Sequence, residues 1–168
     1  MWFDENTITP GDTQAQVVAD WLALGERNLF VTGIDFMWDF QSATLGLGEK
    51  NLYQLWGTTY LGDSCGTAVA TLDGVAGDLI TDAFVAPNGL LLSKTGDSSG
   101  DYANETLGPA TQAAIYAAGG AGSGRSGLSH YNAGGYKVVW LGVNYHNGLT
   151  NPGQRNTLMA NITSYFKN

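Results

Sequence analysis

The stretch Leu141-Gly142-Val143-Asn144-Tyr145-His146 decides the fold predicted for this chain, because it ends an apolar strand with a glycine and then polar residues. Far upstream, Val31-Thr32-Gly33-Ile34-Asp35 repeats this order of strand, glycine and polar residue. In open α/β sheets, ligands bind beyond the carboxyl ends of the strands, where side chains from neighbouring strands meet. We therefore expect two strands that present Asp35 and His146 at the same edge of a sheet.

The segments before these strands alternate as a parallel sheet requires. Trp2-Phe3 is predicted to end a strand. A helix follows, with Thr9 as its N-cap, Pro10 at its first position and its body over 14–24. The expected apolar stripe of this helix contains Val17, Val18, Trp21, Leu22 and Leu24. A buried strand over 28–32 comes next, and this order is typical of βαβ units.

The middle of the chain has a different pattern. After a predicted helix over 49–56, short apolar runs are separated by Asp-Gly, Gly-Asp and Asn-Gly turn signals. We expect an antiparallel insertion of hairpins at the edge of the sheet, over residues 66–95, built from the short runs 68–70, 79–80, 84–85 and 90–92. Residues 113–117 stay ambiguous between helix and strand, because period does not decide short apolar runs.

The last part of the chain predicts a hairpin and a helix. Strands over 128–131 and 136–143 flank a glycine-containing turn, and the second strand is expected to be central. Asn151 and Pro152 then begin a final helix. The residues expected to line its buried face are Leu158, Ile162 and Phe166.

Composition and charge exclude several classes of partner. The 168 residues carry a net charge of −8, and the seven Lys and Arg are scattered along the chain. Nucleic acids and anionic membranes attract clustered positive charge, so neither is expected as a partner. No apolar run approaches a membrane span, and the first residues lack the basic and apolar regions of a signal peptide. The glycine-rich, lysine-poor composition favours a secreted or cell-surface protein of bacteria or archaea.

Other reactive or metal-binding side chains fit weaker patterns. Cys65, the one cysteine, lies in a predicted loop without a local base, which favours a structural role. Asp97 and Asp101 resemble part of a calcium loop, but the spacing of a true loop and its closing glutamate are missing. His130 lies on a predicted strand and is expected to face solvent. We therefore expect no metal and no cofactor.

The two strand-end stretches resemble the catalytic motifs of class I glutamine amidotransferases. In that family a nucleophilic cysteine lies on a strand-to-helix turn, and a histidine and a glutamate follow a later strand. The run 33–37 is similar to the cysteine motif, with Asp35 in place of the nucleophile. The run 142–148 is similar to the second motif, with His146 retained and Gly148 in place of the glutamate. Because an aspartate cannot perform thiolate acyl transfer, the resemblance implies the fold without amidotransferase activity.

A longer resemblance is to amidotransferase-like domains of large exported bacterial proteins, often peptidases. The runs 28–39, 127–131 and 135–142 carry it, together with Arg155 at the start of the last helix. Those domains also have a strand and a helix before the position of Trp2-Phe3, which implies that this chain is a fragment of a longer protein or, as the alternative, a shortened variant that has lost a sheet edge. The resemblance assigns no catalytic role to the aspartate on the turn.

These observations predict one domain over residues 1–168. Its expected fold is a three-layer α/β sandwich of the flavodoxin-like, amidotransferase-like type, with a mainly parallel central sheet and the antiparallel hairpin insertion. The expected function is that of a non-catalytic accessory or interaction domain of an exported multidomain protein, such as a peptidase. Its expected partners are the other domains of that parent protein, or a separate protein.

Alternative functions place chemistry at the same strand ends. A hydrolase would use His146 with Asp35, Asp39 or Cys65 in a cleft at the carboxyl end of the sheet. Against this, an aspartate at a strand-end turn commonly caps the next helix, and a histidine at the start of a loop commonly lies at the surface. A carbohydrate- or peptide-binding module would instead use exposed aromatic residues of the hairpin insertion.

Overall fold

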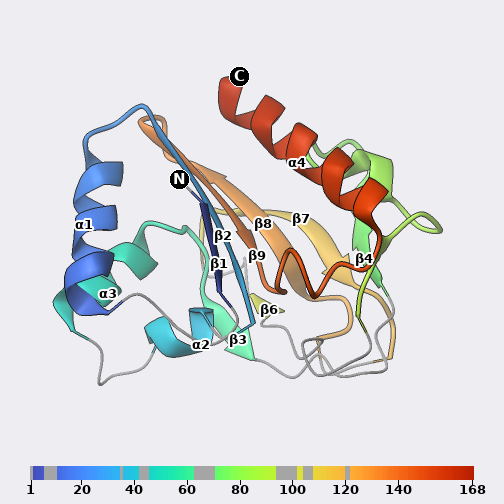
Figure 1. Ribbon diagram of the computed structural model, residues 1–168, viewed down its shortest axis with the longest axis horizontal. Coiled ribbons are helices and arrows are strands. Elements are labelled where there is room, and N and C mark those ends of the chain that lie inside the picture. Colours follow the sequence, from blue (N-terminus) through green and yellow to red (C-terminus); the bar gives the residue numbers. More distant parts are fainter. Residues whose placement is uncertain are drawn as a thin grey trace.

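The computed structural model describes residues 2–5, 11–34, 36–41, 46–62, 71–93, 102–103, 108–119 and 122–168, with only the backbone at 2–5 and 102–103 (Figure 1). Its elements in chain order are β1 (Trp2–Glu5), α1 (Asp12–Ala23), β2 (Arg27–Gly33), α2 (Phe36–Gln41), α3 (Leu47–Gln54), β3 (Tyr60–Gly62), β4 (Thr71–Gly74), the 3-10 helix η1 (Asp82–Phe84), β5 (Leu90–Leu91), β6 (Tyr102–Ala103), β7 (Thr111–Tyr116), β8 (Ser126–Asn132), β9 (Tyr136–Leu141) and α4 (Pro152–Lys167).

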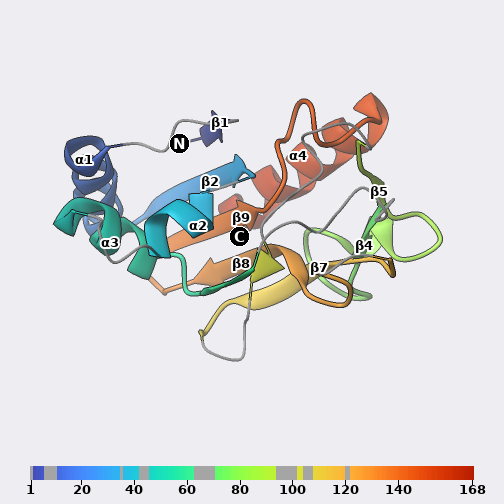
Figure 2. The same cartoon turned by 90° about the horizontal axis from the view of Figure 1, so that it is seen from below.

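The strands form one mixed sheet in the order β1-β2-β9-β8-β7-β4-β5, with β3 paired to β6 and β6 also to β8. The view from below in Figure 2 shows β2, β9, β8 and β7 following one another across this sheet. Only β1–β2 and β2–β9 are parallel pairs among the described strands, and the others are antiparallel. The prediction of a mainly parallel sheet is therefore wrong. Short connections join β7 to β8 and β8 to β9, and a parallel pair needs a long crossover.

The predicted meeting of the two strand-end stretches is confirmed. β2 and β9 are parallel neighbours, in a register that runs from Arg27 opposite Tyr136 to Thr32 opposite Leu141. β9 is central, as expected, because it also pairs antiparallel with β8. The carboxyl ends of β2 and β9 therefore lie side by side.

Helices cover both faces of the sheet around β2 and β9, which makes the fold α/β (Figure 1). On one face, Leu29 and Trp140 belong to an apolar cluster with buried residues of α1, α2 and α3. On the other, Phe30 and Val139 belong to a cluster with Leu158 and neighbouring residues of α4. Alternate residues of each strand point to opposite faces, so both strands contribute to both clusters.

The first helix begins differently from the prediction. Its N-cap is Gly11, whereas Thr9 and Pro10 lie outside the described residues. The carboxylate of Asp12 accepts a hydrogen bond of 2.6 Å from the amide of Gly48, so it joins the starts of α1 and α3. The predicted stripe was partly wrong, because the buried face consists of Ala15, Val18, Ala19 and Leu22 while Val17 is 63% and Leu24 73% exposed.

The predicted insertion is shown only in part. β4 and β5 pair antiparallel, and β5 is the last strand in the order of the sheet. The predicted strands at Leu79-Ile80 and Phe84-Val85 are wrong, since the first two residues lie in turns, Phe84 ends η1 and Val85 follows it as the C-cap. Residues 66–70 and 94–95 of the predicted insertion are outside the described part of the chain.

The carboxyl-terminal elements agree with the sequence. The ambiguous run 113–117 falls mostly in strand β7. α4 begins as predicted, because the side chain of Asn151 accepts hydrogen bonds from the amides of Gly153 (2.9 Å) and Gln154 (3.2 Å). Of its expected buried residues, Leu158 and Ile162 are buried and Phe166 is half-buried. No described helix is long and apolar enough to cross a membrane.

Candidate functional site

The loop after β9 contains His146, the histidine that the sequence predicts as a candidate site residue. An internal turn closes this loop. The amide oxygen of the buried Asn144 side chain accepts hydrogen bonds from the backbone amides of His146 (3.0 Å) and Asn147 (2.8 Å). An asparagine side chain that bonds its own backbone two residues on is a strong turn former. The predicted strand end thus leads into a rigid turn.

The same loop is fixed to α4 and to β2. The Arg155 guanidinium donates to the carbonyls of His146 (2.5 Å) and Leu149 (2.9 Å). In return, the Tyr145 hydroxyl donates to the Arg155 carbonyl at 2.7 Å. The Thr32 hydroxyl of β2 donates to the Val143 carbonyl at 2.5 Å. The backbone around His146 is therefore an anchoring point between the sheet and the last helix.

His146 itself is at the surface. Its side chain is exposed, and its ring stands edge-on to that of Tyr145, with 5.3 Å between the ring centroids. The candidate partners Asp35 and Cys65 lie outside the described residues, as do the loose calcium candidates Asp97 and Asp101. Over the described part of the chain, no group of three or more His, Cys, Asp or Glu could hold a metal ion.

Gly148 occupies a position with no room for a side chain. Its amide donates to the Asn144 carbonyl at 2.8 Å, and its own carbonyl accepts from the Ser93 amide at 2.7 Å. A Cβ atom built on Gly148 would lie 2.5 Å from the Asn144 carbonyl oxygen and 3.2 Å from the Val143 Cβ. Because the nearest obstacle is backbone, a longer side chain requires the turn to open.

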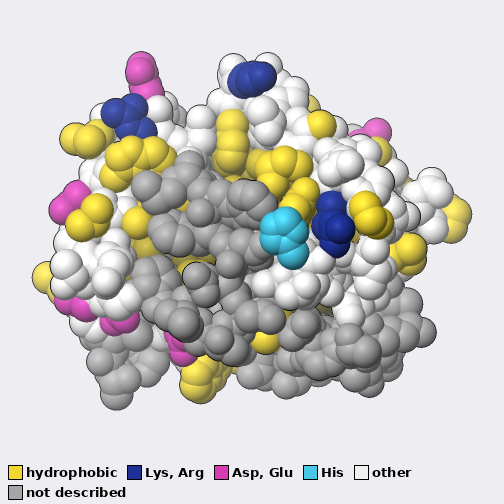
Figure 3. All heavy atoms as spheres, viewed as in Figure 1, with side chains coloured by type: hydrophobic (Ala, Val, Ile, Leu, Met, Phe, Trp, Pro, Cys, Tyr) yellow, Lys and Arg dark blue, Asp and Glu magenta, His cyan; other side chains and the backbone are white. Residues whose placement is uncertain are grey.

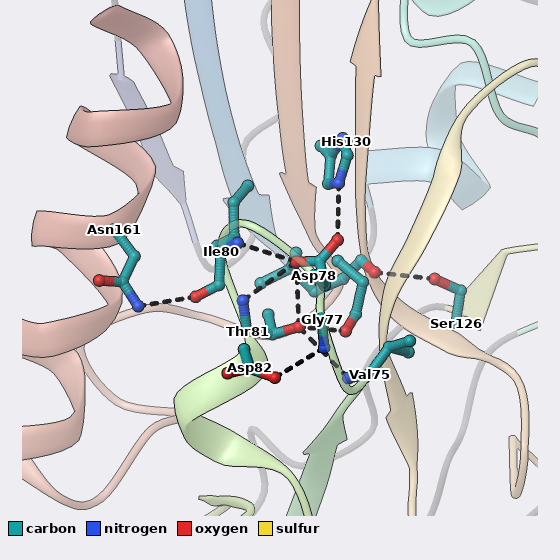
Figure 4. A network of polar contacts seen from close by, with 11 residues as sticks. Val75, Gly77, Asp78, Ile80, Thr81, Asp82, Ser126, His130 and Asn161 are labelled. Atoms are coloured by element: carbon teal, nitrogen blue, oxygen red, sulfur yellow. Dashed lines mark hydrogen bonds and ion pairs between the residues drawn. The ribbon is translucent and has the colours of Figure 1, made fainter. Parts of the chain in front are cut away.

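A second polar cluster, which the sequence did not predict, lies between β8, the turn 75–81 and α4 (Figure 4). Nε2 of His130 is 2.8 Å from Oδ2 of Asp78, and their side chains are only 11% and 5% exposed. The other carboxylate oxygen, Oδ1, accepts from the amides of Ile80 (2.9 Å) and Thr81 (3.0 Å) and lies 3.1 Å from the Thr81 hydroxyl. Asp78 thus organises its own turn while it pairs with the sheet.

The electrostatics of Asp78 favour its charged form. Burial raises the pKa of this carboxyl, but the hydrogen bond and charge of His130 and the bonds from Ile80 and Thr81 lower the pKa, and the net shift is downward. The Thr81 hydroxyl in turn donates to the Ala113 carbonyl of β7. The cluster therefore ties the turn to two strands.

Tyr165 of α4 covers the pair. The ring centroid of Tyr165 is 4.7 Å from that of His130. Nζ of Lys137 lies 5.2 Å from the Tyr165 ring centroid and donates a hydrogen bond to the Tyr165 carbonyl at 3.0 Å. The buried hydroxyl of Tyr165 has no hydrogen-bond partner among the described residues. Burial and the charge of Asp78 raise the pKa of Tyr165 to about 12, so this side chain is neutral at physiological pH.

The prediction that His130 faces solvent was wrong, and the alternation of side chains along a β-strand explains the error. His130 and Leu128 are two positions apart on β8, and they face the same way, toward α4. The alternation could place His130 on the buried face, but it could not identify Asp78 as its partner. A histidine–aspartate pair can transfer protons to or from a neighbouring hydroxyl group. Among the described residues, the neighbouring hydroxyl that donates a hydrogen bond is that of Thr81, and it donates to the backbone carbonyl of Ala113.

Positive charge on the face seen in Figure 3 occurs at separate positions and forms no continuous basic surface there. This distribution offers no track for a phosphate backbone on that face. Comparison of the chain with models of protein families, with curated proteins and with solved structures found no match.

Proposed function

We propose that the chain is a non-catalytic accessory or interaction domain of an exported multidomain protein, such as a peptidase. The proposal includes the finer fold relationship, a flavodoxin-like, amidotransferase-like domain whose sheet continues beyond β9 with antiparallel strands. The parallel pair β2–β9 with helices on both faces supports this relationship. Its partners would be other domains of the parent protein.

The observation that carries the proposal is the turn at Gly148. In the resembling enzymes a glutamate at this position orients the catalytic histidine. Here a Cβ atom would lie 2.5 Å from a backbone oxygen, so the turn is built for glycine and not merely altered by one substitution. A base without an orienting acid loses much of its catalytic value.

The contacts of the loop support a mechanical role. Asn144, Arg155 and Tyr145 direct their polar groups to backbone atoms and so join the sheet to α4. His146 contributes its backbone to this network while its side chain lies at the surface. Such a network stabilises a scaffold whose outer surface is available to partners.

The rival function is a hydrolase in which His146 activates Cys65, and thiol alkylation separates the two. A thiolate paired with histidine forms well below the ordinary thiol pKa of about 8.5. We expect the rate of Cys65 alkylation by iodoacetamide to rise with pH as for an ordinary thiol, and to rise identically in His146→Gln. A reactive thiolate near neutral pH that disappears in His146→Gln would reject the accessory function.

The control for this experiment is Asn147→Asp, which alters the next residue of the same exposed turn and leaves the histidine in place. The version of the hydrolase that uses Asp35 is tested by Asp35→Asn. Hydrolysis of glutamine, peptide and ester substrates should be absent in both the wild type and Asp35→Asn. Any turnover by the wild type that Asp35→Asn or His146→Gln abolishes would establish an enzyme.

A further inference from the structure

A polar cavity of about 450 Å³ lies where the end of α4 meets the turn between β8 and β9. Figure 1 shows the carboxyl-terminal end of α4 and this turn at the same end of the molecule. The cavity is thus at the amino-terminal ends of β2 and β9, opposite to the loop that carries His146. Its volume is within the range of small-molecule sites.

Positive charge is concentrated in this cavity. Arg27, Lys137 and Lys167 line it, which are three of the seven basic residues in a chain of net charge −8. Asn28 and Asn132 add amide groups, and Glu26 is the acidic side chain among the lining residues. A basic cavity in an acidic protein is selective for small anions, because the rest of the surface repels long polyanions.

Two of the cations are held in place. The Lys137 ammonium is 3.0 Å from the Tyr165 carbonyl and over the ring of that residue. The Arg27 guanidinium is 5.9 Å from the Trp21 ring centroid, and Nη1 donates to the Glu26 carbonyl at 3.2 Å. Because each group uses only part of its donors, the remaining N–H groups can bind an anion at a reduced entropic cost.

The positions of these cations restrict the ligand. Lys137 lies opposite Asn28 in the register of β2 and β9, so Arg27 is one residue away from that pair. Arg27 packs toward Trp21 of α1 and Lys137 toward Tyr165 of α4, which places them on opposite faces of the strand ends. A ligand that meets both must carry at least two separated negative groups.

We propose that this cavity binds a small polyanion whose phosphate or carboxylate groups reach the two faces of the strand ends. Helix capping explains Lys137 and Asn28, which donate to carbonyls in the last turn of α4. Capping does not explain Arg27, whose contacts are with α1 and with the residue before it. Guanidinium and ammonium groups at a shared cavity are the usual partners of such oxyanions.

Isothermal titration with pyrophosphate and with citrate, at constant ionic strength, tests the proposal. We expect one saturable site that weakens as chloride is raised. Arg27→Gln and Lys167→Gln should each weaken binding by about tenfold, the effect of one lost charge-assisted contact. The matched controls Arg125→Gln and Lys50→Gln remove the same charges from residues that do not line the cavity, and they should bind as the wild type does.

The two probes distinguish the sources of the ligand chemistry. Saturable binding of pyrophosphate, of citrate or of both, lost in the cavity variants alone, supports the site and names the preferred group. No saturation up to about 10 mM of either probe would overturn it. Equal weakening by Arg125→Gln would also overturn it, because the interaction would then follow net charge. Thermal unfolding of each variant confirms that the fold is intact.

Discussion

His130 Nε2 lies 2.8 Å from Asp78 Oδ2, although the two residues are 52 positions apart in the chain. The pair joins the turn 75–81 to the middle of the sheet beneath α4. Asn161 of α4 completes the connection by donating to the Ile80 carbonyl at 2.8 Å (Figure 4). One turn is thereby held from the sheet below and from the helix above.

Removal of the Asp78 carboxylate should destabilise the turn 75–81. Asp78→Ala leaves the His130 ring and the amides of Ile80 and Thr81 without their acceptor, and breaking a buried pair typically costs about 3 kcal/mol or more. Urea unfolding measures this loss. Asp20→Ala, which removes an exposed carboxylate bonded to Gln16, should cost less than about 0.5 kcal/mol. Similar losses in the two variants would show that the pair contributes little.

The lowered pKa of Asp78 fixes the direction of a pH effect. A carboxyl whose pKa is lower in the folded state stabilises the fold above its unfolded value, near 3.8, and loses this contribution as the pH falls through the folded value. The difference in unfolding free energy between wild type and Asp78→Asn should therefore be larger above pH 3.8 than in strong acid. It should shrink below pH 3.8. A difference that persists undiminished in strong acid contradicts this assignment.

The hydroxyl of Tyr165 should lose its proton at a higher pH than an ordinary tyrosine does. Its pKa of about 12 in the folded protein exceeds the ordinary value of 10.0, so the folded state stays protonated where the unfolded chain ionises. Stability should therefore fall as the pH rises above 10.0, and Tyr165→Phe should fall less steeply. At neutral pH we expect the free energy of unfolding of Tyr165→Phe to lie within about 1 kcal/mol of the wild-type value, because the lost hydroxyl has no described hydrogen-bond partner.

The titration of Tyr165 can be followed directly by the ultraviolet absorbance of tyrosinate. The difference between wild type and Tyr165→Phe isolates this group from the other tyrosines. Ionisation of Tyr165 near pH 10.0, while the protein is still folded, would show that its hydroxyl is open to solvent.

Gly148→Ala should destabilise the turn that carries His146. The added methyl group would lie 2.5 Å from the Asn144 carbonyl oxygen, and insertion into a packed site costs about 1–3 kcal/mol. Gly153→Ala is the control, since its methyl group would meet only the Asn151 side-chain oxygen at 3.3 Å within the first turn of α4. A Gly148→Ala variant as stable as wild type would remove the main support for the accessory function.

Leu158→Asp should unfold the domain. Leu158 is fully buried in the cluster between α4 and the sheet, and an unpaired charge there costs several kcal/mol. Asn156→Asp places the same carboxylate on the exposed face near the start of the helix, where the helix dipole favours it. Circular dichroism should show loss of structure in the first variant and native stability in the second.

The sequence predicted the elements whose signals are local or repeated. Asn151 and Pro152 marked the start of α4 correctly, because capping depends on adjacent residues. The pairing of β2 with β9 followed from two similar strand ends. The antiparallel pairing of β8 with β9 was predicted as a hairpin over a glycine-containing turn. The antiparallel β7–β8 pair was missed, because hydrophobic period did not decide the run 113–117 between helix and strand.

The candidate site shows the same division. His146 was placed correctly on the loop after β9, but its surroundings depend on Arg155 and Tyr145 in a folded geometry. The pair of Asp78 and His130 carries no motif, because residues 52 positions apart meet only through the packing of a turn on the sheet. The helix α2 was missed as well, since six residues are too few for a period.

The register of β2 and β9 also constrains the order in which the chain can fold. The bond from Thr32 to Val143 joins residues 111 positions apart, and β2 finds its central partner only when that distant segment is present. The β8–β9 hairpin, by contrast, closes over a short turn. Since closing a long loop costs more entropy than closing a short one, we expect the hairpin to nucleate folding and to recruit β2 afterwards. During synthesis, β2 would therefore lack its central partner in the sheet, and α1 the completed sheet on which it packs, until β9 has left the ribosome.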